Sequence, residues 1–180
     1  MDAGNCNIET VLRDGGLICI RAIHPDDKKH LYNAFHQLSM QSRYFRFLGY
    51  KKEISRKELS YFTEIDYKRH VALVAVLPEG QNERIIGVGR YIRPDLNRKS
   101  ALTDVAVAVI DKYQGRGIGT LLLKHLAVIA SNLSITQFEA DIHSENLQML
   151  RIIKHCGFRA IFKFDQGIMH VSLKIPKWNE

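Results

Sequence analysis

Three glycines in the middle of the chain have the spacing of a phosphate-binding turn. Gly115, Gly117 and Gly119 follow an apolar segment at 105–110 and lead directly into a leucine-rich segment at 118–130. The first backbone N–H groups of a helix have no partner within it, and the helix dipole attracts anions to that end. Glycine has no Cβ, which lets a phosphate approach the backbone and lets the turn take positive φ. The pattern therefore predicts a site for a phosphorylated cofactor at the carboxyl end of a central strand.

Two familiar phosphate-binding motifs match poorly. A P-loop has the pattern Gly-x-x-x-x-Gly-Lys-Ser/Thr, and no glycine of this turn precedes such a lysine. A dinucleotide fingerprint has the pattern Gly-x-Gly-x-x-Gly, and its third glycine, counted from Gly115, falls on Thr120. Both indications are weak, so the cofactor has to be inferred from other residues.

The turn and its surroundings resemble the GNAT superfamily of acetyltransferases. Residues 114–119, Gln-Gly-Arg-Gly-Ile-Gly, are similar to the Gln/Arg-x-x-Gly-x-Gly/Ala signature between a central strand and the pyrophosphate-binding helix of that family. Asn146 and then Gly157-Phe158 resemble its Asn-then-Gly-Phe ending. The resemblance implies an α/β (α+β) fold. Its centre would be a mixed, splayed sheet of about six to seven strands, flanked by helices on both faces.

The amino-terminal half resembles one branch of the superfamily, the Pat-type bacterial protein lysine acetyltransferases. The similarity spans roughly residues 12–164, and its segments are Asp14-Gly15-Gly16, Ile20-Arg21, Pro25-Asp26-Asp27, residues 42–47, Ile65-Asp66-Tyr67 and residues 86–90. This resemblance implies acetyl-CoA as co-substrate. It also implies transfer of the acetyl group to a primary amine, a protein lysine, by direct attack in a ternary complex.

The general base implied by the resemblance is Asp104. It lies ten residues before Gln114, where the Pat-type relatives place a catalytic glutamate. An amine of pKa near 10.4 is protonated at neutral pH, so a group must take its proton before it attacks. The ordinary pKa of an aspartate is about 3.9, and we expect the apolar neighbours Leu102 and Val105 to raise it by desolvation. Alternatively, Asp104 caps the strand end or pairs with a surface lysine.

The other implied site residues would bind acetyl-CoA. In the resembled family the central strand splays from its neighbour, so peptide groups at Val107 and Val109 are expected to bind the pantetheine arm, and the Val109 N–H to hold the oxyanion. Asn146 either hydrogen-bonds to that arm or only caps its helix. Ile153 stands where many relatives have a tyrosine general acid, but a thiolate of pKa near 8.5 can leave unassisted. The residues expected at the phosphates are Gln114, Gly115, Arg116, Gly117, Ile118, Gly119 and Thr120.

Length and composition favour a single domain over residues 1–180, with flexible ends at about 1–12 and 176–180. The apolar runs are too short to span a bilayer, and the first ten residues lack the pattern of a signal peptide. Cys6, Cys19 and Cys156 are widely separated, which fits reduced thiols in a cytoplasm. The histidines and cysteines show no metal-site spacing. We therefore expect a cytoplasmic protein with no metal and no membrane partner.

The net charge of +7 suits an anionic partner. Basic residues concentrate at 43–69 and are interleaved with Tyr44, Phe45, Phe47 and Tyr50, a composition also found on nucleic-acid surfaces. We favour a solvated helical face with buried aromatic rings, and anionic acetyl-CoA explains part of the charge. Nucleic acid is not expected as a partner, and a homodimer stays open.

The hydrophobic pattern predicts strands that alternate with helices. The expected strands are 17–23, 71–77, 84–92, 101–110, 137–142, 158–164 and 168–175. The expected helices are 26–38, 55–62, 118–130 and 146–155, and Ser55 with Glu58 forms a capping box. Segment 101–110 is apolar without alternation, which is typical of a strand covered on both faces. Residues 94–99 are expected to form a polar loop.

Two alternatives to a protein lysine acetyltransferase stay open. In the first, the acceptor is a small amine or a peptide N-terminus, because substrate loops vary within the superfamily. In the second, the chain is a catalytically silent sensor that binds acyl-CoA, because Asp104 replaces the glutamate and Ile153 the tyrosine of the relatives. Release of free thiol from acetyl-CoA would separate an enzyme from a sensor.

Overall fold

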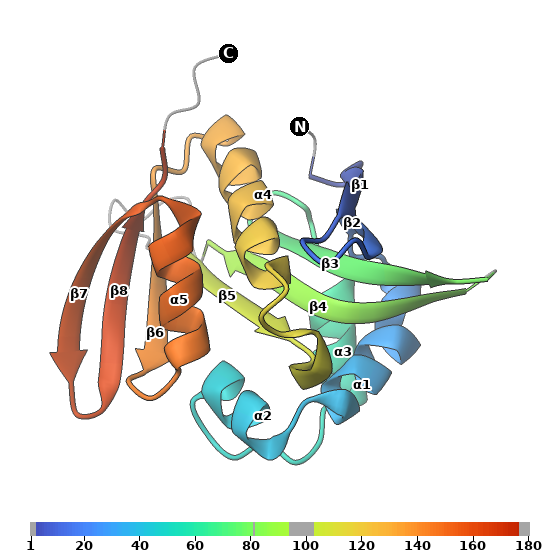
Figure 1. Cartoon of the computed structure of the whole chain (residues 1–180), viewed down its shortest axis with the longest axis horizontal. Coiled ribbons are helices and arrows are strands. Elements are labelled where there is room, and N and C mark those ends of the chain that lie inside the picture. The colour runs from blue at the N-terminus through green and yellow to red at the C-terminus, as the bar shows by residue number, and fades with distance from the viewer. Residues whose placement is uncertain (1–2, 81, 94–102, 177–180) are drawn as a thin grey trace.

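A computed structural model describes residues 3–80, 82–93 and 103–176, which form a mixed sheet of eight strands with helices on both faces (Figure 1). The strand order is β1-β2-β3-β4-β5-β6-β8-β7, and only β5 and β6 run parallel to each other. The strands are β1 (Asn7–Val11), β2 (Leu17–Ala22), β3 (His70–Glu79), β4 (Asn82–Ile92), β5 (Asp104–Val109), β6 (Gln137–His143), β7 (Arg159–Asp165) and β8 (Ile168–Lys174).

The described part of the chain has five helices. They are α1 (Lys28–Gln37), α2 (Met40–Phe47), α3 (Arg56–Thr63), α4 (Ile118–Asn132) and α5 (Leu147–Cys156), and two 3-10 turns precede α1 and α4, η1 (Pro25–Asp27) and η2 (Asp111–Tyr113). Helices α4 and α5 lie on one face, whereas α1 and α3 lie on the other (Figure 1). Leu122 and Leu126 of α4 are fully buried on the first face. Leu31 and Phe35 of α1 pack with Val74 on the second face.

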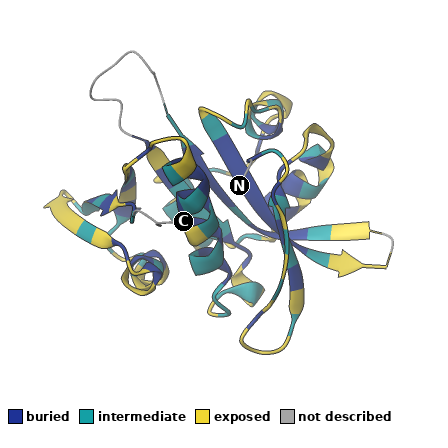
Figure 2. Cartoon of the chain, turned by 90° about the horizontal axis from the view of Figure 1, so that it is seen from above, coloured by how far each residue is buried: buried dark blue, intermediate teal, exposed yellow. Residues whose placement is uncertain are grey.

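The two central strands, β3 and β4, form a long hairpin. Residues 71–76 of β3 are at most 1% exposed, so this strand is covered on both faces (Figure 2). Burial of apolar surface contributes about 25 cal/mol per Å². This part of the sheet therefore lies within the hydrophobic core, and β5 adjoins it because β5 pairs with β4 along its whole length.

Strands β5 and β6 meet at one end and then separate. Their only register pair is Asp104 with Glu139, next to a hydrogen bond of 2.8 Å from the Glu139 N–H to the Thr103 carbonyl. Beyond this point the edge of β5 that faces β6 has no ladder partner among the described residues. The sheet is therefore splayed, as the resemblance implied.

The two faces of β5 carry different kinds of side chain. Val105, Val107 and Val109 point toward α4 and α5, where they pack in one apolar core. Successive side chains of a strand point to opposite faces, so Asp104, Ala106 and Ala108 point toward the side of α1 and α3. On this second side, Ala108 lines a small cavity together with residues of α1 and α3.

The predicted fold class is confirmed, and most elements lie within one to three residues of their expected bounds. Three details differ. The first is helix α2, which was not predicted as a separate element. The sheet has eight strands rather than six to seven, because Asn7–Val11 pairs with β2 as strand β1 although residues 1–12 were expected to be a flexible end. The single helix expected at 26–38 is divided into η1 and α1. Residues 94–99, 101 and 102 lie outside the described residues.

The predicted capping box is confirmed at the start of α3. The Ser55 hydroxyl accepts a hydrogen bond of 3.2 Å from the Glu58 N–H, and the Glu58 carboxylate accepts one of 2.9 Å from the Ser55 N–H. No helix in the described part of the chain combines the length and the apolar character needed to cross a membrane.

Candidate active site

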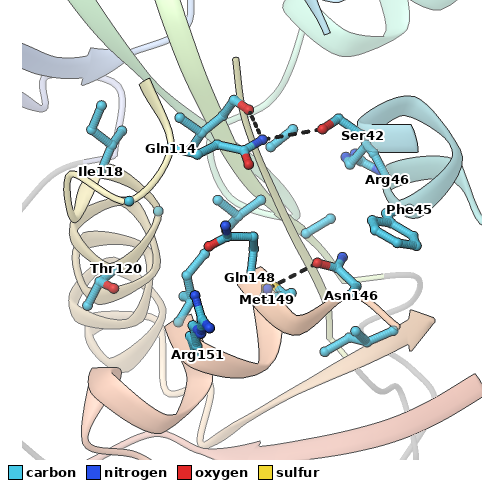
Figure 3. A pocket seen from close by; sticks show the side chains of 18 of the residues that line it. Ser42, Phe45, Arg46, Gln114, Ile118, Thr120, Asn146, Gln148, Met149 and Arg151 are labelled. Atoms are coloured by element: carbon cyan, nitrogen blue, oxygen red, sulfur yellow. Dashed lines mark hydrogen bonds between the residues drawn. The ribbon is translucent and has the colours of Figure 1, made fainter. Parts of the chain in front are cut away.

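A cavity of about 440 Å³ opens where β5 and β6 separate. Its walls come from β5, β6, the glycine turn, the first turns of α4, and helices α2 and α5 (Figure 3). The volume is in the range of sites that bind a drug-sized ligand. The cavity brings together most residues that the sequence singled out, namely Val107, Val109, Gln114, Gly115, Gly117, Ile118, Gly119, Thr120 and Asn146.

The glycines of the turn serve two different purposes. Gly115 has φ 76° and Gly117, the N-cap of α4, has φ 91°, and a Cβ at either residue would meet no atom within 4 Å. Positive φ is the reason for glycine at these two positions, and the space in front of them stays open. Gly119 differs, because its Cβ would lie 2.5 Å from Cδ1 of Ile152. At that position glycine allows α4 and α5 to pack closely.

Backbone N–H groups of β5 face the cavity. The Ile110 N–H donates to the Ile86 carbonyl across the β4–β5 pair at 2.9 Å. In an antiparallel pair the residues that exchange hydrogen bonds alternate with those that do not. Val109 and Val107 are therefore non-bonded positions, and their N–H groups point away from β4 toward the gap beside β6. The Val109 carbonyl is occupied, because the side-chain amide of Gln114 donates to it at 2.9 Å.

Helix α2 is held against the site by Asp111. The Asp111 carboxylate accepts hydrogen bonds from the Ser39 N–H at 2.8 Å, the Ser39 hydroxyl at 2.7 Å and the Ser42 hydroxyl at 2.8 Å. Partial desolvation raises the pKa of Asp111, but the hydrogen bonds from Ser39 and Ser42 outweigh it and hold this pKa below its ordinary value. Ser42 also accepts a hydrogen bond of 3.3 Å from the Gln114 amide, which connects α2 to the glycine turn (Figure 3).

We expect Asp111→Ala to loosen α2 and to lower the free energy of unfolding by about 1–3 kcal/mol, because three donors lose a charged acceptor. The pKa of Asp111 is lower in the folded state than its ordinary 3.8. The contribution of the charged Asp111 carboxylate to the free energy of unfolding is therefore present above about pH 3.8, and it is lost as the pH falls through the lower pKa of the folded state. Urea unfolding from pH 3 to 7 measures this difference. Asp165→Ala, at an exposed position of β7, is the control. A pH-independent difference would contradict the assignment to the charge.

Asn146 is the N-cap of α5. Its side-chain oxygen accepts a hydrogen bond of 3.1 Å from the Met149 N–H. The amide nitrogen has no partner among the described residues, and Asn146 lines the cavity (Figure 3). The two roles left open by the sequence are thus compatible, because the oxygen caps the helix while the nitrogen can donate to a ligand.

Arg116 differs from the other residues of the turn. Its guanidinium pairs with the Asp14 carboxylate in the β1–β2 turn, and Arg116 does not line the cavity. The cations that line it are Arg13, Arg46 and Arg151. These arginines were not predicted as site residues. Arg13 directly precedes the predicted Asp14 motif, and Arg151 follows Asn146 by five residues, but neither spacing signals a phosphate site without the fold.

Asp104 lies at the closed end of the splay and is not part of the cavity wall. Its side chain is exposed on the face opposite α4. Two further carboxylates, Asp141 and Glu139, share this face of the sheet. Partial burial, followed by the negative charges of Asp141 and Glu139, raises the pKa of Asp104 above its ordinary value. The expected rise in pKa is thus present, and burial is its main cause, as expected. Val105 points to the other face of the sheet, and Leu102 lies outside the described residues.

The two neighbouring carboxylates are fixed by β8. The Asp141 carboxylate lies 2.5 Å from Nδ1 of His170, and the Glu139 carboxylate accepts a hydrogen bond of 2.8 Å from the Ser172 hydroxyl. Asp141 also lines the cavity. This face of the splay therefore presents a row of three acids, Asp104, Glu139 and Asp141, which favours the approach of a cationic amine.

The residue at the position of the relatives' tyrosine cannot protonate a leaving thiolate. Ile153 is 2% exposed and packs in the core of α4 and α5. His155 lines the cavity, and its Nδ1 lies 2.7 Å from the Arg151 carbonyl. Within the described ranges, no three His, Cys, Asp or Glu side chains come together as metal ligands would.

Comparisons with known proteins agree with this geometry. A family model described as "Acetyltransferase (GNAT) domain" matches residues 18–159. Acetyltransferase Pat of Mycolicibacterium smegmatis is 30% identical over 169 residues, which are 94% of this chain and 49% of that relative. The chain thus spans about half the length of that relative.

Solved structures share the fold. The crystal structure of the GNAT domain of S. lividans PAT has a TM-score of 0.83 at 30% identity and covers 93% of this chain and 96% of that chain. The structure of yncA, a putative acetyltransferase from Salmonella typhimurium with its cofactor acetyl-CoA, has a TM-score of 0.67 at 16% identity. It covers 87% of this chain and 92% of that chain, and at this identity the likeness shows the fold alone.

Proposed function

Because the chain belongs to the GNAT acetyltransferase family, we propose that it transfers an acetyl group from acetyl-CoA to a primary amine, and that this amine is a lysine side chain of a protein. The observation that carries the proposal is the unpaired edge of β5. It points backbone N–H groups into a cavity whose other end is an open glycine turn at the start of a helix. The similarity to Pat supports the choice of a protein acceptor.

The residues present fit a long, phosphate-bearing thioester. The open space at Gly115 and Gly117 suits phosphate oxygens, which the N-terminal N–H groups of α4 would bind. Arg13 and Arg151 would supply positive charge from the cavity wall. The amide nitrogen of Asn146 would donate to the pantetheine arm. The Salmonella protein of the same fold, solved with acetyl-CoA, supports this choice of co-substrate.

The reaction requires a proton acceptor and an electrostatic stabiliser. Asp104 would take the proton of the attacking ammonium, through a water if the shorter side chain does not reach it, and its raised pKa suits this task better than an ordinary aspartate would. The Val109 N–H would donate to the thioester oxygen as negative charge develops there. A donor of this kind contributes about 3 kcal/mol. The acetyl group would pass directly to the amine, and thiolate would leave without a general acid.

The test is the release of free thiol from acetyl-CoA with different acceptors. We expect release with lysine-containing proteins, and acetyl-lysine on them by mass spectrometry. If thiol is released with a polyamine or a peptide N-terminus but with no protein lysine, the acceptor is a small amine or a peptide N-terminus and not a protein lysine. A thermal shift with acetyl-CoA and no thiol release with any amine would favour the silent sensor, which the replacements at Asp104 and Ile153 would then explain.

The basic surface beside α2 gives a second test of the protein acceptor. Lys52, Arg56 and Lys57 are exposed, whereas Lys51 pairs with Glu58 at 2.5 Å. We expect reversal of the three exposed charges to lower the acetylation rate of an acidic protein acceptor about tenfold at low salt, because steering is lost. The loss should shrink toward 0.15 M salt, where the screening length is about 8 Å. The acetylation rates of the wild type and of the charge-reversed variant, compared at several ionic strengths, measure this loss.

The matched control for this prediction reverses Arg159, Lys163 and Lys174 at the β7–β8 edge of the sheet, which are also exposed. It should leave the rate unchanged. Equal losses with a small amine and with the protein acceptor would contradict steering of a protein partner.

A further inference from the structure

Two arginines lie together on the face of the sheet opposite α4. Arg46 comes from α2, and Arg90 comes from β4, opposite Ala106 of β5. Both line a second cavity, of about 60 Å³, beneath α1 and α3. Arg90 is only 4% exposed, and Arg46 is half-buried. Arginine is rarely this buried without a partner of opposite charge.

The contacts of the two guanidinium groups leave their charges uncompensated. Arg46 lies over the Phe47 ring at 5.0 Å and Arg90 over the Phe62 ring at 4.3 Å. Arg90 also contacts the Phe62 carbonyl at 3.3 Å and Nε2 of His70 at 3.0 Å.

These partners of Arg90 are neutral. Burial, and then the charge of Arg90, lower the pKa of His70 to about 4, so its ring is neutral at pH 7. No carboxylate of the described residues lies within 4.0 Å of either arginine, since the ion pairs found there involve other cations.

The two cations also repel each other. Burial, followed by the positive charge of Arg46, lowers the pKa of Arg90 to about 9. Both groups therefore remain charged at neutral pH, in surroundings that weaken Coulomb forces less than water does. An anion bound between them would relieve this repulsion and form charge-assisted hydrogen bonds with both.

The small cavity is adjacent to the active-site cavity. Leu38, Arg46 and Ala108 line both of them, so Arg46 stands in the shared wall. Asp104 and Ala106 are two residues apart on the same face of β5, a separation of about 7 Å along the strand. Because Arg90 is opposite Ala106, Arg90 lies one pleat from the proposed base.

We propose that Arg46 and Arg90 form a carboxylate-binding site for the acceptor, which selects amines that carry a carboxylate close to the nitrogen that is acetylated. The inference rests on the proposed function, because it names a feature of the acceptor for that reaction. The carboxylate can belong to an aspartate or glutamate beside the target lysine of a protein, or to a free amino acid. In both cases the amine lies toward Asp104 while the carboxylate lies between the two guanidinium groups.

A carboxylate fits this site better than a phosphate does. Apart from the two arginines, every residue that lines the small cavity is apolar, including Phe35, Phe62 and Val88. Two planar guanidinium groups match the two oxygens of a carboxylate, and apolar walls suit the hydrocarbon stem that carries it. A phosphate would leave further oxygens without donors, which is costly in an apolar cavity.

The first arm of the experiment uses no reaction. Glutarate, a dicarboxylate without an amine, should raise the melting temperature of the wild type in a concentration-dependent way, and sulfate at equal ionic strength should raise it less. Arg46→Gln should abolish the glutarate shift, whereas Arg159→Gln, at an exposed arginine of β7, should retain it. Arg46→Lys keeps the charge but loses the planar fork and should retain part of the shift.

The second arm measures acetylation of matched acceptors. One pair is lysine and lysine methyl ester. The other is a capped Ala-Lys-Glu peptide and its Ala-Lys-Gln counterpart. In the wild type we expect that, in one pair, the kcat/KM of the carboxylate-bearing member is at least about tenfold higher than that of its neutral counterpart. The neutral counterpart lacks one charged hydrogen bond, and a loss of this size is what that bond implies. Arg46→Gln should reduce this ratio to about one. Because the ratio is taken within each variant, a change that lowers the rates of both members equally does not affect it.

The outcomes separate the site from the reaction. If glutarate raises the melting temperature only when Arg46 is present, but no amine is acetylated, the anion site is supported and the proposed function is contradicted. Acetyl transfer with equal rates for both members of each pair keeps the function and overturns the site. A glutarate shift that is absent in the wild type, or unchanged in Arg46→Gln, also overturns it. The pair in which the carboxylate-bearing member has the higher kcat/KM shows whether the carboxylate belongs to a peptide or to a free amino acid.

Discussion

Asp104→Asn should lower kcat for acetyl transfer about 100-fold or more, because it removes the proton acceptor while it keeps the size and polarity of the side chain. The affinity for acetyl-CoA should barely change, since Asp104 lies outside the cavity wall. Steady-state rates with a protein or lysine acceptor, together with acetyl-CoA titrations followed by thermal shift, measure the two quantities. Asp104→Glu is the conservative control and should retain substantial activity.

The pH dependence of the rate gives this prediction a sharper form. The base works only when it is deprotonated, so the rate should rise as the pH passes the raised pKa of Asp104. Asp141→Asn removes one of the negative charges that raise this pKa, and it should move the acidic limb of the profile to lower pH. Asp104→Asn should abolish the limb. Wild-type rates in Asp104→Asn over the whole pH range would assign the proton transfer to another group.

Gly117→Val should abolish the acetyl-CoA-dependent rise in melting temperature. Gly117 has φ 91° at the N-cap of α4, a conformation that a β-branched residue rarely adopts, and the added side chain would fill the open space before the turn. A ligand at 100 times its Kd stabilises the folded state by about 2.7 kcal/mol, and this whole increment should be lost. Differential scanning calorimetry with and without acetyl-CoA measures it.

The control for Gly117→Val is Gly80→Val. Gly80 also has positive φ, 63°, and a Cβ added there would meet no atom within 4 Å, but it lies at the exposed tip of the β3–β4 hairpin. Backbone strain should therefore be similar in both variants, while the ligand-induced shift survives only in Gly80→Val. A full shift in Gly117→Val would remove the turn from the phosphate site. Gly119→Val is a poorer probe, because the collision with Ile152 would also separate α4 from α5.

The parts of the fold that the sequence could predict are those with strong local signals. The apolar strand β5, the glycine turn and helix α4 adjoin in sequence, and α4 is apolar enough to be recognised by itself. Helix α2 was not predicted as a separate element, because it is only eight residues long and none of its residues is fully buried. It is held by Asp111, about 70 residues away, through Ser39 and Ser42.

The same distinction holds for the site. Gln114, Gly117 and Asn146 were found from motifs within short segments, and the structure places them around one cavity, while their roles remain predictions. Arg116 belongs to the same motif, but a contact with Asp14, 102 residues earlier, turns it away from that cavity. Arg46 and Arg90 could not be paired from the sequence, since only the packing of α2 on the sheet brings them together.

The alternation of side chains along β5 has a consequence for engineering. Odd-numbered residues face α4 and the glycine turn, and even-numbered residues face α1 and α3. Under the carboxylate-site proposal, changes of acceptor preference can therefore be confined to one side of a single strand, at Ala106, Ala108 and the residues that contact them, without altering the packing of the other side. A one-residue insertion in β5 would have the opposite effect, because it would exchange the two sets of side chains and disable both sides at once.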